Sequence, residues 1–133
     1  MTKSRKEVIY AKGGQVHSSP IPQGVKAAGL IFLSAIRGVD PATQKVETDD
    51  PEAQARQIFE NLKAALASAD ASLDDVVKVA VYMKDIRDRS AFNKAWADYF
   101  PKEPPARFAV QVADMGAAGD KSRILVDVTA LAP

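Results

Sequence analysis

The chain contains no cysteine and only one histidine, His17. Without thiol groups it can form neither a disulfide nor a thiolate nucleophile, and it cannot bind a metal through cysteine. A site built on several histidines is excluded as well, and a Ser-His-Asp triad would have to use His17. Because His17 lies in a segment rich in glycine, serine and proline, we expect a loop there and a histidine that is incidental to function.

Long apolar runs and a surplus of one charge are also absent. The run Leu30–Ile36 is far too short to cross a bilayer, and the N-terminal MTKSRKEVIYA lacks the apolar core of a signal peptide. Lys and Arg number 18 against 17 Asp and Glu, and they are spread along the chain. This balance argues against a nucleic-acid partner or an anionic membrane surface. We therefore expect a cytoplasmic protein with no membrane association.

What the 133 residues do contain is a mixture of strand and helix patterns. Apolar side chains recur at helical spacing after a capping signal, Asp49 or Asp50 followed by Pro51, and again over residues 88–100. Strand patterns occupy residues 7–11, 25–28, 30–36, 76–83, 108–112 and 124–131. This order predicts one α+β domain over residues 1–133, a mixed sheet with two helices packed on one face.

Arg107 stands at the start of an apolar strand pattern, within EPPARFAVQV. Strand alternation places Phe108 and Val110 on one face, which we expect to pack on the helices, and Arg107 and Ala109 on the other. A guanidinium that is buried without a partner is strongly destabilising. Arg107 must therefore meet water, a carboxylate or a ligand.

Asp127, within ILVDVTALA, is the acidic counterpart of Arg107 in the last strand pattern. The pattern alone leaves two interpretations of this pair open. Both side chains can be ordinary surface charges, or they can form a salt bridge with each other. Alternatively, Arg107 binds a substrate carboxylate in fork geometry, and Asp127 handles a proton or a water molecule.

Three long stretches carry more specific motifs. They are PIPQGVKAAGLIFLSAIRGVDPATQKV near the start, EAQARQIFENLKAALASADASLDDVVKVAVYMKDI in the middle and FNKAWADYFPKEPPARFAVQVADM toward the end. In the combination of QAR..FENLKA, DVVKV.VY.KD and PPAR, the chain resembles the Rid family, also called YjgF or endoribonuclease L-PSP, over almost its full length. The resemblance implies a chorismate-mutase-like α+β fold and a homotrimer, with sheets inside, helices outside and three ligand clefts between neighbouring subunits.

The resemblance also implies a reaction, the hydrolysis of an imine or enamine. Arg107 matches the family's signature arginine, which binds the carboxylate of a 2-imino acid, and Asp127 stands where active members carry a glutamate that orients the attacking water. Ammonia then leaves and a 2-oxo acid remains, with no metal or organic cofactor, because a protonated imine is already electrophilic. By position in the family pattern, the expected substrate-binding residues are Ile21, Ser34, Ala35, Asn93, Arg107 and Ala109.

The chain departs from the family pattern at several points. Ile21 replaces the aromatic residue of the GPYxQG motif, Asp127 is shorter than glutamate, and the segment between Arg107 and Asp127 is longer and contains MGAAGD. Three functions therefore stay open: an imine or enamine deaminase, a non-catalytic regulatory trimer that binds small carboxylates, and an endoribonuclease. The near-neutral charge and the lack of a basic patch with aromatic residues argue against the third.

Overall fold

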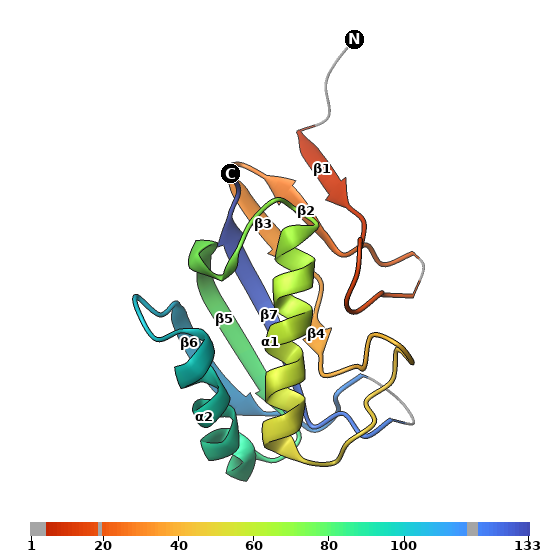
Figure 1. Cartoon of the computed structure of the whole chain (residues 1–133), viewed down its shortest axis with the longest axis vertical. Helices are drawn as coiled ribbons and strands as arrows, with labels where there is room; N and C mark the ends of the chain where they lie inside the picture. Colours follow the sequence, from red (N-terminus) through yellow and green to blue (C-terminus); the bar gives the residue numbers. More distant parts are fainter. Residues whose placement is uncertain (1–4, 19, 117–119) are drawn as a thin grey trace.

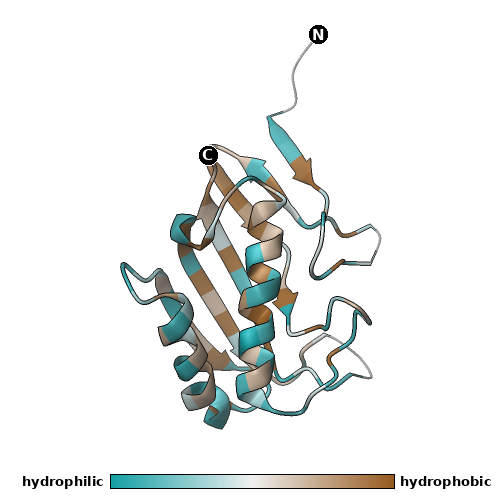
Figure 2. Cartoon of the chain, in the orientation of Figure 1, coloured by the Kyte–Doolittle hydropathy of each residue, from teal (hydrophilic) through white to brown (hydrophobic). Residues whose placement is uncertain are grey.

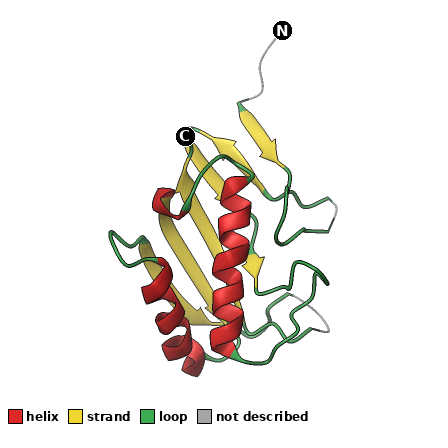
Figure 3. Cartoon of the chain, in the orientation of Figure 1, coloured by secondary structure: helices red, strands yellow, loops and turns green. Residues whose placement is uncertain are grey.

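The computed structural model describes residues 5–18, 20–116 and 120–133, so part of MGAAGD lies outside the described residues. In the described ranges, a seven-stranded sheet carries two helices on one face (Figure 1) (Figure 3). The strands are β1 (Lys6–Ile9), β2 (Gly24–Ala27), β3 (Leu30–Leu33), β4 (Ile36–Arg37), β5 (Val76–Met83), β6 (Ala106–Gln111) and β7 (Ile124–Leu131). The helices are α1 (Pro51–Ala67) and α2 (Arg89–Tyr99), with short 3-10 helices η1 (Leu73–Asp75) before β5 and η2 (Ile86–Asp88) before α2. The predicted α+β architecture is confirmed.

The sheet is mixed because of one parallel pair. The strand order is β1-β2-β3-β7-β5-β6, and β4 pairs with β7. Neighbouring strands are antiparallel except β5 and β6, which are parallel and joined by η2 and α2. A parallel pair needs such a crossover, and the crossover helix packs back onto the sheet. Helix α1 lies on the same face and contacts β4 and β7 (Figure 1).

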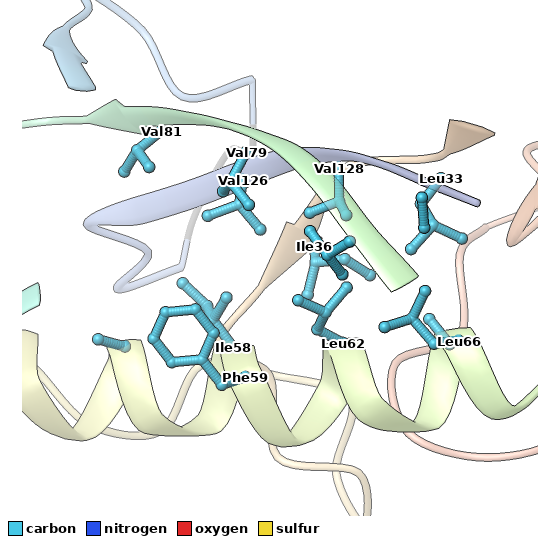
Figure 4. Packing of buried hydrophobic residues seen from close by; sticks show 14 of the residues in the cluster. Leu33, Ile36, Ile58, Phe59, Leu62, Leu66, Val79, Val81, Val126 and Val128 are labelled. Atoms are coloured by element: carbon cyan, nitrogen blue, oxygen red, sulfur yellow. The ribbon is translucent and has the colours of Figure 1, made fainter. Parts of the chain in front are cut away.

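Helix α1 supplies the centre of the core. The Asp50 side chain caps it by accepting a hydrogen bond from the Ala53 N–H at 2.8 Å, and Pro51 is its first residue, as the capping signal predicts. Its apolar stripe packs on the sheet through Ile58, Phe59, Leu62 and Leu66, opposite Val79, Val81, Val126 and Val128 (Figure 4). The outer faces of both helices are largely hydrophilic (Figure 2). Within the described ranges, no helix has the length and apolar character needed to span a bilayer.

The two faces of β6 are the reverse of the prediction. Phe108 and Val110 lie on the sheet face opposite the helices, where each is 41% exposed, whereas Arg107 and Ala109 point toward α2. The prediction was wrong because it assigned the more apolar face to the core. An arginine can take a core-facing position when its flat guanidinium lies on aromatic rings. With Phe32, which is 45% exposed, Phe108 and Val110 form an open apolar sheet face in the protomer.

The apolar run over residues 30–36 is not the single strand that its pattern predicts. β3 ends at Leu33, and β4 resumes the pairing with β7 at Ile36, after a break at Ser34 and Ala35. The backbone N–H of Ser34 donates to the Gln23 carbonyl oxygen at 2.9 Å, so this part of the chain bonds to the loop before β2 instead of to β7. Apolar side chains flank the break on both sides, which is why the pattern does not reveal it.

Candidate functional site

Arg107 lies between β6 and the sheet-facing side of α2. One terminal NH₂ group donates a hydrogen bond to the Asn93 side-chain oxygen at 2.5 Å. The guanidinium carbon lies 4.8 Å from the centre of the Trp96 ring and 5.3 Å from that of Phe92. Helical spacing puts Phe92, Asn93 and Trp96 on neighbouring positions of α2, and the ring faces attract a cation. The helix therefore holds the guanidinium in one orientation.

The charge of Arg107 is not neutralised within the described part of the protomer. There Arg107 forms no ion pair, although it is half-buried, and most N–H donors of its fork are unused. Burial, followed by the positive charge of Arg89, lowers the pKa of the Arg107 guanidinium. A half-buried cation without a counterion suits an anionic ligand such as a carboxylate. Among the described residues, no group of three or more histidine, cysteine or acidic side chains is placed to hold a metal ion.

A second group of predicted site residues lies at the break between β3 and β4. The Ser34 hydroxyl donates to the Pro22 carbonyl oxygen at 2.8 Å, which ties the break to the loop before β2. That loop presents Ile21, whose side chain is 51% exposed, and Ala35 is exposed beside Ser34. The structure thus brings Ile21, Ser34 and Ala35 to one corner of the sheet.

His17 belongs to this corner, although sequence reasoning dismissed it. Its ring nitrogen Nε2 lies 2.6 Å from the Ala35 carbonyl oxygen, and Nδ1 lies 3.3 Å from the Gln23 side-chain oxygen. Since a carbonyl oxygen only accepts, the contact with Ala35 is a hydrogen bond in the tautomer that carries the proton on Nε2. The buried side chain of Gln15 adds a bond from the Arg37 N–H at 2.7 Å. These polar contacts connect distant parts of the chain, so no local pattern could reveal them.

Asp127 lies apart from Arg107, on the opposite face of the sheet. Residues that pair across neighbouring strands have their side chains on the same face of the sheet. Ala80 pairs with Asp127 on one side and with the exposed Phe108 on the other, so these side chains share the open face. Arg107 pairs with the buried Val79, so its side chain lies on the helix-covered face. The interpretation that Arg107 and Asp127 form a salt bridge with each other is therefore wrong for one protomer. The Arg107 group and the Ser34 corner are also separate, because β3 and β6 are three strand spacings apart, about 14 Å. A single protomer does not unite the predicted site residues.

Comparison with known proteins gives a consistent result. The model of the family described as "Endoribonuclease L-PSP" matches residues 17–132. A RutC family protein of Pyrococcus horikoshii is 36% identical over 127 residues, which cover 96% of this chain and 97% of that protein. The 3-aminoacrylate deaminase RutC of Acinetobacter baylyi is 36% identical over 107 residues, 80% of this chain and 85% of that protein. The crystal structure of the YjgF gene product of E. coli superposes with a TM-score of 0.83 at 30% identity, covering 94% of this chain and 98% of that one.

Proposed function

The chain belongs to the Rid family, known as endoribonuclease L-PSP, and from this premise we propose that it is a deaminase that hydrolyses reactive 2-imino acids or related enamines to 2-oxo acids and ammonia. The observation that carries the proposal is Arg107, a half-buried guanidinium that α2 orients and that has no carboxylate partner among the described residues. A relative named 3-aminoacrylate deaminase supports deamination of a small carboxylate as the chemistry.

The protein's own part in the reaction is positioning and one proton relay. Arg107 binds the substrate carboxylate through its free fork, which places the imine carbon at a constant distance from the strand. Asp127 accepts a proton from a water molecule as the water oxygen bonds to the imine carbon. The carbinolamine that forms takes that proton on its nitrogen. Its C–N bond then breaks as the new hydroxyl loses its proton and becomes the 2-oxo carbonyl, and ammonia leaves. Backbone atoms of Ser34, Ala35 and Ala109 and the side chains of Ile21 and Asn93 line the site in this proposal.

The proposal includes a homotrimer whose clefts lie between subunits. Its support is the open apolar sheet face, since exposed aromatic side chains such as Phe32 and Phe108 gain from being covered by another subunit. Asp127 lies on that same face, next to Phe108 across Ala80, so a second copy packed there can meet it. An intersubunit cleft combines residues that one protomer keeps apart. A single domain and a cytoplasmic location belong to the same proposal.

The test is the release of 2-oxo acid from imino acids that an amino-acid oxidase generates in the assay. Wild type is expected to accelerate release, Arg107→Ala to abolish the acceleration, and Arg107→Lys to restore little because the fork is lost. Lys94→Gln removes an exposed positive charge from α2 next to Asn93 and is expected to behave like wild type. If wild type does not accelerate release, and Arg107→Ala changes nothing, the proposal fails.

A non-catalytic carboxylate-binding trimer is the second candidate, favoured by the short side chain of Asp127. It predicts saturable binding of small 2-oxo acids that depends on Arg107, without turnover of any imine. An endoribonuclease has the weakest support, because the net charge is +1 and basic residues do not gather along the sequence. RNA cleavage that coelutes with the protein and is lost in Arg107→Ala would revive it.

A further inference from the structure

The side of α2 that orients Arg107 carries a second arginine. Arg89 is the first residue of α2, and Asn93 and Trp96 follow it at helical spacing, four and seven residues on. Side chains at these intervals line one side of a helix. Arg89 is exposed, and after burial its positive charge is the second cause that lowers the pKa of the Arg107 guanidinium. The two arginines therefore face the same region between α2 and β6.

The acidic side chains near the start of α2 are already occupied. Asp85 is paired with Arg87 at 2.6 Å, and Asp88 with Arg123 at 2.8 Å. Within the described ranges, Arg89 has no ion pair, and neither has Arg107. Two adjacent cations without counterions repel each other, and an anion between them relieves that repulsion. The first turn of α2 adds the positive end of a helix dipole on the same side.

The geometry of α2 and β6 places Arg89 about 6 Å further along the strand direction than Arg107. The crossover makes α2 run opposite to β6, so the start of α2 lies beside the end of β6, where the Gln111 side-chain oxygen accepts from the Ile86 N–H at 3.0 Å. From Asn93 back to Arg89 the helix rises about 6 Å. From Arg107 on to Ala109 the strand advances about 6.6 Å in the same direction.

We propose that Arg89 is a specificity-determining residue that binds a second acidic group, so the preferred substrates are imines or enamines of dicarboxylic amino acids. This inference rests on the proposed function, in which Arg107 holds the carboxylate next to the imine carbon. Arg89 then holds the side-chain carboxylate, about one helical turn away. The second acid takes no part in bond making or breaking, and it contributes a charge-assisted hydrogen bond.

The test compares two acids that resemble the reaction products, 2-oxoglutarate with two carboxylates and 2-oxobutanoate with one. Isothermal titration calorimetry measures both dissociation constants for wild type, Arg89→Gln, Arg89→Lys and Lys94→Gln. Wild type is expected to bind 2-oxoglutarate about 10- to 100-fold more tightly, the range for one charge-assisted hydrogen bond. Arg89→Gln should lose this preference while its affinity for 2-oxobutanoate stays unchanged, and Arg89→Lys should keep most of it. Lys94→Gln, which loses the same charge elsewhere on α2, should keep all of it.

The outcomes distinguish this inference from the function on which it rests. Equal affinity of wild type for the two acids overturns the role of Arg89 and leaves the deaminase proposal standing. A loss in Arg89→Gln that is the same for both acids also overturns it, because Arg89 would then orient another protein group and not a second carboxylate. If wild type binds neither acid, the role of Arg107 fails together with that of Arg89. Circular dichroism of each variant verifies that the fold is intact.

Discussion

Trp96 is expected to hold Arg107 in place by a measurable interaction. The guanidinium lies 4.8 Å from the Trp96 ring centre and 5.3 Å from that of Phe92, and Arg107 is half-buried. A cation–π contact is worth roughly 0.5–1 kcal/mol at exposed sites and about 2 kcal/mol when desolvated. For Arg107, between these limits, we expect about 1 kcal/mol from Trp96. Trp96→Leu also removes aromatic packing against Phe100, so a single mutant would overstate the contact.

A double-mutant cycle isolates this contact from the packing loss. Urea unfolding at one protein concentration gives the free energy of unfolding for wild type, Trp96→Leu, Arg107→Met and the double mutant. The predicted coupling free energy is about 1 kcal/mol, and a cycle with Trp96→Phe should give a smaller coupling because an aromatic ring remains. Trp96→Leu should also weaken 2-oxobutanoate binding about 5-fold. Without the Trp96 ring the Arg107 guanidinium is less ordered, so ligand binding has to supply the free energy that orders it. Coupling indistinguishable from zero, with unchanged ligand affinity, would show that Trp96 does not hold Arg107 in place.

Three further predictions concern the rest of the fold. Phe108→Asp places a charge on the open sheet face. If wild type forms the proposed trimer, we expect this variant to be a folded monomer in light scattering. A trimer that persists in the variant would contradict the proposed interface. Gln54→Met should lower the free energy of unfolding in urea by about 2–4 kcal/mol. The fully buried Gln54 amide donates to two carbonyl oxygens and accepts from the Arg123 N–H, and methionine makes none of these hydrogen bonds. A loss below about 1 kcal/mol would contradict this prediction. Hydrogen bonds from Arg87 lower the pKa of Asp85 from 3.8 to about 2. The stability from this pair is present above pH 3.8 and is lost as pH falls toward 2. Asp85→Asn should make the free energy of unfolding less dependent on pH below pH 3.8. An unchanged pH dependence in this range would count against a stabilising role of the Asp85–Arg87 pair.

The sequence predicts the elements of this fold better than the orientation of their faces. β5 and β7 occupy the predicted residues, because their apolar runs end at clear turn signals, and Asp50 caps α1 as expected. The orientation of β6 was mispredicted, since counting apolar residues per face takes no account of an aromatic helix surface that accepts a guanidinium. That surface forms only when α2 crosses back over the sheet, which is a tertiary event.

For the candidate site, too, the sequence predicts individual residues better than their arrangement in space. Family motifs identify Arg107 and Asn93, and the structure brings those two into contact. The separation of Arg107 from Asp127 follows from the pairing register of β5 with its two neighbours, which no local pattern contains. His17 was dismissed for a related reason, because its partner Ala35 lies 18 residues away in a break that was predicted to be a strand.

A crystal structure of the protein soaked with 2-oxobutanoate shows whether Arg107 anchors a substrate carboxylate. We predict density for the acid beside β6, with both carboxylate oxygens bonded to the Arg107 fork and the guanidinium still over Trp96. The 2-oxo carbon should then point toward Asp127 of a neighbouring subunit. An acid bound elsewhere, or an Arg107 already engaged by a carboxylate of the protein, would contradict the account.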